Sequence, residues 1–512
     1  MHPSIQEARK PAAIKCFCQR AGNPSLSAFV LLLVLTTAAG CASVKPDRRF
    51  LDVQRNVAQQ LDRRVIWDRG GPEGEPIRAA TVDLLSRPLD TDAAVQVALL
   101  NSNSLQATFE DLGVAQADLV QAGLLPNPNF AGFIRWFDIA PHGPNWNLGL
   151  HLPLQIFLIP LRKRLAGTAL DEAVLRVTGA VLKQAAETRT AFYAFQADEQ
   201  VVGARKTVND LANITATFME RQYKAGNVED LKFAGEQVAR QQAKIALIEA
   251  ESTARVSRER LRRLMGFSSS TVSWEIEREA RLPPETSVED SELVDLAISS
   301  SPEVAAARKF VQREQYALDL AHKWLLETAT IGLETERAPG GGYQTGPDFS
   351  LELPIFDQRQ AAYARQEALI RQSRRRLADT EDRVSQEVRT ALDRMNAAAR
   401  VARYYASDVI PLRQQISGMT EKRYQGMLLG VFDMLAAKAD ESTAIIAGIR
   451  ARQDYWNARS DLELALGGRL PPGVPTPPPT TLPAAGETSK SPATVPAPSM
   501  PEMPGMSKPG AK

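Results

Sequence analysis

Two short stretches of the chain alternate apolar and polar residues, which is the pattern of β-strands that have one apolar face. In residues 145–152 the apolar positions are Trp146, Leu148, Leu150 and Leu152. In residues 348–353 they are Phe349, Leu351 and Leu353. The polar positions between them are Asn145, Asn147, His151, Asp348, Ser350 and Glu352. A weaker alternation precedes each stretch across a segment rich in glycine and proline, so the sequence predicts two β-hairpins, at 128–153 and 328–354.

Long segments with helical periodicity follow each hairpin. Residues 162–222 contain no proline and predict a helix on the order of 90 Å long at about 1.5 Å per residue. After the second hairpin, apolar residues recur at alternating spacings of four and three, as at Val384, Val388 and Ala391. This heptad spacing predicts helices that pack against neighbouring helices. The four long helices expected are 162–222, 228–266, 358–424 and 431–467.

The order of these elements is repeated along the chain. Leu-Pro at 152–153 recurs at 353–354, and Tyr223 in Arg-Gln-Tyr recurs as Tyr424 in Lys-Arg-Tyr, both at the same offset of 201 residues. Self-similarity at a fixed offset indicates a structural unit that is used more than once. The sequence therefore predicts two repeats, 85–275 and 285–470.

The N-terminus has the features of a secretory signal peptide over residues 1–40: a basic stretch, a short apolar run and small residues directly before Cys41. The apolar run is shorter than the roughly 20 residues that span a bilayer. Small residues before a lone cysteine resemble a bacterial lipobox, which implies lipidation of Cys41. An ordinary signal peptide with an incidental cysteine is the alternative. In bacterial lipoproteins an aspartate directly after the lipidated cysteine resembles an inner-membrane retention signal. The residue at this position is Ala42, so the sequence favours the outer membrane.

The segments that flank the repeats carry less information. Residues 41–84 are expected to form a lipid-anchored extended segment. Residues 471–512 hold 13 of the 33 prolines, together with many small and polar residues. Such a composition cannot bury a core, so this end of the chain is predicted to be a disordered tail.

Composition excludes several classes of function. The 512 residues include 61 basic and 60 acidic side chains, and the net charge of +1 gives no sign of a nucleic-acid partner. The cysteines are confined to positions 16, 18 and 41, and the four histidines are scattered. Neither a disulfide framework nor a zinc site is expected. Since no catalytic Ser/His/Asp set or phosphate-binding loop is present, we expect neither an enzyme nor a bound cofactor.

The two-faced hairpins have the character of a transmembrane β-barrel wall, apolar outside and polar inside. A chain with four such strands cannot close a barrel alone, because the smallest membrane barrels use about eight and open sheet edges are not tolerated in lipid. Several copies must close it, with the long helices continuing the cylinder. The expected fold is mainly α with a small β part: antiparallel coiled-coil helices that form an α-barrel, and four strands per chain in a shared β-barrel. The polar strand residues are then expected to face the lumen.

This order of elements resembles the outer-membrane efflux protein (TolC) family, as do Leu353-Pro-Ile-Phe-Asp357 and the two tyrosine-containing turns. The resemblance covers roughly residues 85–470 and implies a lipid-anchored homotrimer in the outer membrane that extends into the periplasm. It also implies two partners, a periplasmic adaptor (membrane fusion) protein and an inner-membrane resistance-nodulation-division or ABC-type pump. The segment 112–128 looks similar to components of heavy-metal efflux systems, and drug-efflux ducts share much of the same frame.

The function implied is a passive exit duct for heavy metals or drugs. A non-conducting structural coiled-coil lipoprotein of the outer membrane is the alternative, and it would have no use for a two-faced hairpin. In the family, aspartates shortly after the second turn close the periplasmic tip. The matching residue here is Asp433, and Asp230 beside the first turn is a second gate candidate.

An aspartate that only interacts with the dipole at a helix start is the alternative for Asp433. Two other gate positions of the family fall on the uncharged Leu429 and Ala436. The turn residues expected to contact the adaptor are Tyr223, Gly226, Tyr424 and Gly426. The alternative is that they serve only to shape the turns.

Overall fold

A computed structural model of the protein describes residues 47–71, 74–136, 143–267, 274–277, 281–284, 292–337, 341–468 and 470. The predicted signal peptide, Cys41 and the proline-rich tail lie outside the described residues. Among the helices that are described, none combines the length and the apolar composition needed to cross a membrane.

The two predicted hairpins join in one antiparallel sheet. Its strands are β1 (Asn129–Arg135), β2 (Asn145–Pro153), β3 (Thr330–Arg337) and β4 (Tyr343–Ser350). They are ordered β1-β2-β3-β4, so the two hairpins meet where β2 pairs with β3. The register places Leu150 opposite Leu333, and Leu333 opposite Pro347. The outer edges of β1 and β4 have no strand partner among the described residues.

The fourth strand ends earlier than the alternation of residues predicts. Ser350 is the last residue of β4, and its partner Thr330 is the first residue of β3. Directly before Thr330 the chain forms the short helix α10 (Trp324–Thr328), so no strand lies opposite the next residues of the alternation. Glu352 therefore follows the sheet and is not part of it.

Long helices follow both hairpins. The expected helix 358–424 is interrupted by a π-helical turn, η2, because Pro411 has no N–H to donate and its ring crowds the preceding helical turn. The others are close to the predicted ranges, and α6, with 66 residues, is on the order of 100 Å long. Their bounds are α6 (Ile159–Lys224), α7 (Asp230–Leu264), α11 (Gln360–Tyr404), η2 (Tyr405–Val409), α12 (Ile410–Gln425) and α13 (Val431–Ala465).

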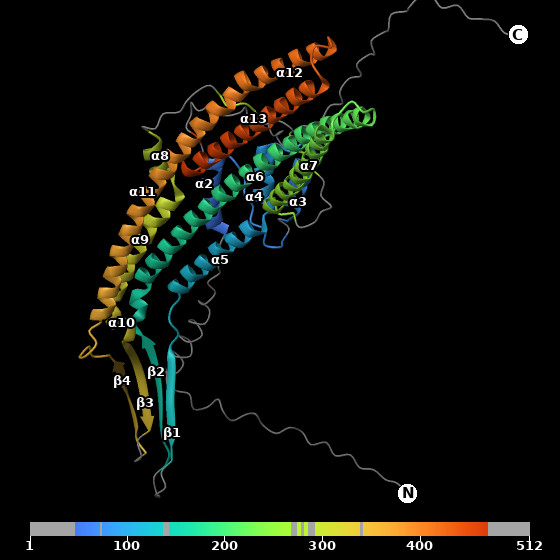
Figure 1. Ribbon diagram of the computed structural model, residues 1–512. Coiled ribbons are helices and arrows are strands. Elements are labelled where there is room, and N and C mark those ends of the chain that lie inside the picture. Colours follow the sequence, from blue (N-terminus) through green and yellow to red (C-terminus); the bar gives the residue numbers. More distant parts are fainter. Residues whose placement is uncertain are drawn as a thin grey trace, which may run out of the picture. The chain divides into compact units, whose positions relative to one another are not determined.

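Four helices lie side by side in the same order as the four strands to which they connect (Figure 1). Helix α5 (Asn103–Gly123) precedes β1, α6 follows β2 through the 3-10 turn η1 (Leu154–Leu158), α9 (Pro302–Ala321) precedes β3, and α11 follows β4. In this first row α5 packs on α6, α6 on α9, and α9 on α11. In a second row α7 packs on α6, α6 on α13, and α13 on α12. The edge helices of the first row are therefore α5 and α11, and those of the second row are α7 and α12.

The segment expected to be extended, 41–84, is instead mostly helical where it is described, apart from residues 62–71 between its two helices. It forms α2 (Asp47–Leu61) and most of α3 (Gly74–Leu85). The spacing of Phe50, Val53, Val57 and Leu61 by three, four and four residues explains α2, because it places all four on one helical face. That face is buried against α5 and α6, in a core that includes Phe109.

The two halves of the chain have matching geometry at matching positions. Ser102 ends α4 (Thr91–Asn101) and precedes α5, just as Ser301 ends α8 (Leu293–Ser300) and precedes α9. After α7 and α13, Gly266 and Gly467 have φ angles of 81° and 79°. Each glycine lies close to the last residue of a short helix, α4 in the first case and α8 in the second.

Candidate functional site: the sheet faces and the helical turns

One face of the sheet is apolar and exposed. The register brings the side chains of β1, β2, β3 and β4 to one face in lateral rows, such as Phe130, Leu150, Leu333 and Pro347. Phe349, in the next row, is 81% exposed. The large exposed apolar residues on this face are Phe130, Ile134, Leu148, Leu152, Ile331, Leu333, Tyr343 and Phe349. An apolar exposed band of this kind indicates a surface that meets lipid or protein.

The opposite face carries carboxylates, each held by an asparagine or a histidine on another strand. Asn145 Nδ2 donates to Glu336 Oε1 over 3.0 Å, and Asn147 donates to Glu334. His151 Nε2 lies 2.8 Å from Asp348 Oδ2. The predicted polar residues Asn145, Asn147, His151 and Asp348 thus share one face, as their alternation requires. Ser350 is on the same side at the end of β4.

Glu334 and Glu336 were not identified as site residues from the sequence. The alternation of β3 could have found them, since Gly332, Glu334 and Glu336 occupy every second position. The glycine and the preceding apolar residues weaken the signal. Only the register, which places Glu336 opposite Asn147, puts both carboxylates on the polar face.

His151 and Asp348 are two strands apart, and glycine makes their contact possible. The residue of β3 between them is Gly332, which pairs with His151 on one side and with Asp348 on the other. A Cβ atom at position 332 would lie 2.6 Å from His151 Cδ2. The imidazole therefore lies over the backbone of β3 in the space that a side chain would otherwise fill.

The turns at the far ends of the long helices have the same hydrogen bonds in both repeats. Gly226 N–H donates to Tyr223 O and Asn227 N–H to Gln222 O; at an offset of 201 residues, Met427 and Leu428 make the same two bonds. This pattern ends a helix with one residue in the left-handed conformation. That residue is Gly226 (φ 75°) in the first turn and Met427 (φ 61°) in the second.

Gly426 therefore does not take the left-handed position in the second turn that Gly226 takes in the first. Gly426 has a φ of −78°, which any residue can adopt, and the left-handed position belongs to the next residue. Met427 is also 94% exposed, and Leu428 beside it is exposed as well. The corresponding residues of the first turn, Gly226 and Asn227, are small or polar, whereas these two residues of the second turn are apolar.

The two gate candidates have local partners at the helix starts. Asp433 accepts a hydrogen bond from Gly430 N–H over 3.1 Å and so caps the N-terminus of α13. Asp230 is the first residue of α7 and accepts a hydrogen bond from the Tyr223 hydroxyl, which raises the pKa of Tyr223 above its ordinary value. Tyr223 also stacks on Phe233, with ring centroids 4.5 Å apart.

An aromatic contact joins the two helical hairpins near their turns. Phe432 of α13 lies 6.2 Å from Phe218 of α6, measured between ring centroids. Lys232 Nζ of α7 is 5.2 Å from the centroid of Phe432, within the range of a cation–π interaction. Lys232 occupies the position in the first repeat that corresponds to Asp433. This contact could not be identified from the sequence, because nothing in the pattern brings α6 and α7 to α13.

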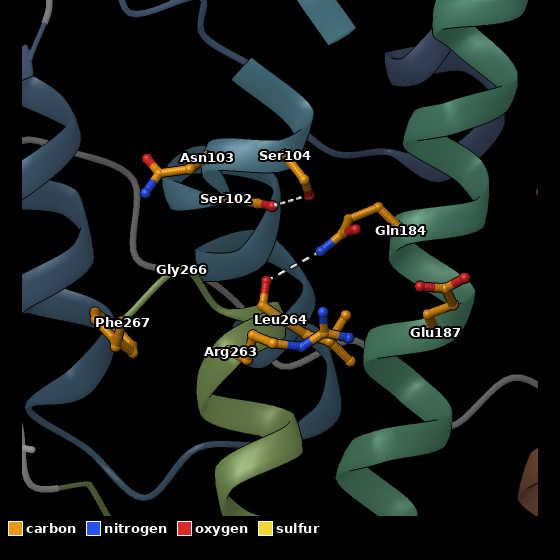
Figure 2. Close-up of a pocket in the computed structure, with 9 residues that line it drawn as sticks. All are labelled: Ser102, Asn103, Ser104, Gln184, Glu187, Arg263, Leu264, Gly266 and Phe267. Carbon is orange, nitrogen blue, oxygen red and sulfur yellow. Dashed lines mark hydrogen bonds between the residues drawn. The ribbon is translucent and has the colours of Figure 1, made fainter. Parts of the chain in front are cut away.

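A pocket of about 330 Å³ lies where the start of α5 meets α6 and the end of α7 (Figure 2). Gln184 of α6 crosses it and donates to Leu264 O over 3.0 Å. The charged groups at its wall are Glu187 and Arg263. Among the described residues, no three metal-ligating side chains lie close enough together to hold a metal ion.

Comparison with known proteins agrees with this architecture. Residues 293–468 match the sequence model of the family "Outer membrane efflux protein". Among curated proteins, sequence comparison finds no match. Solved structures with a similar fold include a membrane protein from Pseudomonas aeruginosa, at 18% identity and a TM-score of 0.62, where the match covers 74% of this chain and 92% of that chain.

Two further similar structures are named as outer-membrane proteins. The CmeC outer membrane channel of Campylobacter jejuni has 14% identity and a TM-score of 0.62, with 74% of this chain and 85% of that chain covered. The outer membrane protein VceC of Vibrio cholerae has 16% identity and a TM-score of 0.59, with 74% and 96% covered. The resemblance to the outer-membrane efflux protein family is confirmed: residues 293–468 match that family's sequence model, and the fold is that of these channels.

Proposed function

We propose that the protein is the outer-membrane channel of an efflux system, in which several copies close a pore that conducts substrate passively outward. The observation that carries the proposal is the sheet: it has an apolar exposed face, a polar face and, among the described strands, two unpartnered edges. A membrane β-barrel needs an apolar band outside and a polar wall inside. Because open edges are not tolerated in lipid, β4 of one copy is expected to pair with β1 of the next.

The second row of helices supports closure by the same copies. Along α7, the exposed residues Leu231, Val238 and Ile245 recur every seven positions, and Leu231 is 83% exposed. On the other edge, α12 exposes Leu412 and Met419, again seven residues apart. A heptad seam of this kind needs a helical partner. A neighbouring copy at each edge would cover both seams and close a helical tunnel below the pore.

Three copies suit a conducting channel better than two. Two copies would supply eight strands, and the interior of a barrel of about that size is filled by its own side chains. Three copies give a wider lumen, in agreement with the homotrimer that the family resemblance implies. We place this homotrimer in the outer membrane, held additionally by lipid on Cys41, with the helical turns in the periplasm.

The turns are the proposed contact with a periplasmic adaptor, which would connect the duct to an inner-membrane pump of the resistance-nodulation-division or ABC type. Their place at the ends of the long helices, farthest from the sheet, supports this assignment (Figure 1). The duct supplies a polar path and no chemistry, and the pump supplies the energy. The substrates proposed are heavy metals or drugs.

The proposal is tested by the conductance of the purified, full-length mature protein in planar bilayers. We expect discrete channels from a trimeric sample. Leu333→Lys places a charge on the lipid-facing side near mid-strand, where it costs about 2–4 kcal/mol, and should abolish insertion. Gln344→Lys adds the same charge to the polar face and should leave insertion intact. A folded protein without conductance would overturn the proposal and favour a structural lipoprotein.

A further inference from the structure

The edge helices α5 and α11 each carry an exposed heptad seam. On α5 the seam residues are spaced by four and three, and all of them are exposed; they are Ala107, Asp111, Val114, Asp118 and Gln121. On α11 the spacing is the same, for Ala364, Ala368, Arg371, Arg375 and Ala378. Val114, in the middle of the first seam, is 63% exposed. Alternating spacings of four and three define the face that a second helix packs against.

Both seams point away from the chain that carries them. On α5 the buried residues Leu105, Phe109 and Leu112 pack toward α2 and α6. At about 100° per residue, Phe109 lies roughly 160° around the helix from the midpoint between Val114 and Asp118. On α11, Ile370 and Ser373 are buried and likewise lie on the side opposite Arg371 and Arg375. Each edge helix thus packs inside its own chain with one face and offers the opposite face outward.

The two seams carry opposite charges that have no strong partners among the residues that the structure describes. Helix α5 has three acidic residues and no basic residue. Among the described residues, Asp111 and Asp118 have no ion pair or hydrogen bond through their side chains, and the same holds for Arg375. Arg371 has only an exposed intrahelical contact, 3.7 Å from Glu367. Uncompensated charges at the centre of a packing seam indicate a partner of opposite charge.

The geometry points to a second copy of this chain as that partner: we infer that α5 of one copy packs antiparallel against α11 of its neighbour, with Asp111 and Asp118 pairing with Arg371 and Arg375. This inference rests on the proposed oligomeric channel. The directions fit, since α5 runs toward the sheet and α11 runs away from it (Figure 1). In a closed ring, the row order α5-α6-α9-α11 makes α11 and α5 neighbours.

The charges also lie at comparable distances from the sheet. At about 1.5 Å per residue, Asp118 and Asp111 are roughly 8 and 18 Å from the end of α5 that precedes β1. Arg371 and Arg375 are roughly 17 and 23 Å from the start of α11. Without any shift Asp111 is level with Arg371, and a shift of about 7 Å between the two helices brings Asp118 to within about 2 Å of Arg371 and Asp111 to within about 2 Å of Arg375 along the helix axes. The alanines at the other seam positions allow the helices to approach closely.

Charge reversal and its compensation test the inference. The oligomeric state of the purified full-length protein is measured in detergent by light scattering coupled to size exclusion. We expect Asp111→Arg with Asp118→Arg to lower the trimer fraction by about tenfold or more, because like charges then face each other at the seam. Arg371→Asp with Arg375→Asp should do the same. The four substitutions together should restore the trimer.

A matched control separates this seam from general effects of charge. Arg374→Asp with Arg376→Asp makes the same change in charge on the same helix turns, but at about 80° and 120° from the midline between Arg371 and Arg375. We expect this variant to remain trimeric. A cross-link gives a second measurement, because Ala107 and Ala378 are roughly 24 and 27 Å from the sheet-side ends of α5 and α11. Ala107→Cys with Ala378→Cys should yield covalent dimers and trimers with a short bismaleimide, whereas each single substitution should not.

The outcomes distinguish this inference from the proposed function. If the wild-type protein is a conducting trimer, while the reversed variants also remain trimeric, the α5–α11 contact is wrong and the channel stands. Failure of the fourfold variant to restore the trimer, with no cross-link between positions 107 and 378 in the double variant, overturns the contact as well. If the folded wild-type protein neither conducts nor assembles, both proposals fail.

Discussion

His151 Nε2 on β2 lies 2.8 Å from Asp348 Oδ2 on β4, although the whole of β3 separates the two strands. The contact exists because the intervening residue is Gly332, whose missing side chain leaves room for the imidazole. Three strands of the sheet are thus joined by one side-chain bond in addition to their backbone ladders. On the polar face, this bond lies at the end of the sheet nearer the helices.

A side chain at position 332 should break this contact. In Gly332→Ala the new Cβ would lie 2.6 Å from His151 Cδ2 and 2.9 Å from Leu150 O, so the imidazole must leave Asp348. We expect destabilisation of about 1–3 kcal/mol, the usual cost of overpacking. The measurement is the thermal melting of the purified protein in detergent.

Gly346→Ala is the matched control for that experiment. Gly346 is on β4, on the same face of the sheet, and a Cβ there meets no atom within 4 Å. Its melting temperature should stay close to the wild-type value. Equal melting temperatures for Gly332→Ala and Gly346→Ala would contradict the role assigned to Gly332.

Met427→Gly should stabilise the second turn. Met427 is in the left-handed conformation, which costs a residue with a Cβ about 1–2 kcal/mol, and glycine avoids this cost while it loses somewhat more entropy on folding. We expect a net gain of about 0.5–1 kcal/mol, and a loss of similar size for Gly226→Ala in the first turn. Hydrogen exchange of the turn amides measures both. A less protected turn in Met427→Gly would show that the Met427 side chain makes contacts that outweigh its backbone strain.

The sequence predicts the regular parts of this fold well because they depend on local periodicity. The alternation at Trp146 to Leu152 gives β2, and the proline-free stretch after it gives α6, to within a few residues. The predictions are wrong where a segment distant in the sequence determines where an element begins or ends. β4 ends at Ser350 because β3 begins at Thr330, a limit that no residue of β4 itself encodes.

The functional residues divide in the same way. The polar face of β2 follows from its own alternation, but the bond from His151 to Asp348 depends on a glycine in the strand between them. For the left-handed residue of the second turn, the local sequence indicates the wrong position. A glycine at 426 suggests the special conformation one residue too early, and only the hydrogen bonds of the turn assign it to Met427.

Tyr223 should titrate above the ordinary phenol pKa of 10.0. Its hydroxyl donates to Asp230, a bond that exists only while the phenol is protonated, and the nearby negative charge opposes ionisation. Because the folded-state pKa is raised, the bond contributes stability fully below about pH 10 and loses it as the pH rises through the folded-state pKa. Ultraviolet difference spectra between the wild type and Tyr223→Phe isolate this group. Asp230→Asn should return its pKa toward the ordinary value; an unchanged titration in Asp230→Asn would contradict the assignment.

Two substitutions of Asp433 separate its two proposed roles, as a gate charge and as a helix cap. Its carboxylate accepts a hydrogen bond from Gly430 N–H, so Asp433→Ala removes both the charge and the cap, at a cost of about 1 kcal/mol to the start of α13. Asp433→Asn removes the charge but keeps an oxygen that can accept the same bond. If a ring of aspartates lines the closed entrance, both variants should lower the preference for cations, and Asp433→Ala should also increase ion leak. Conductance and reversal potential in planar bilayers measure these effects. Unchanged cation preference in Asp433→Asn, with leak only in Asp433→Ala, would leave Asp433 as a helix cap and remove it from the gate.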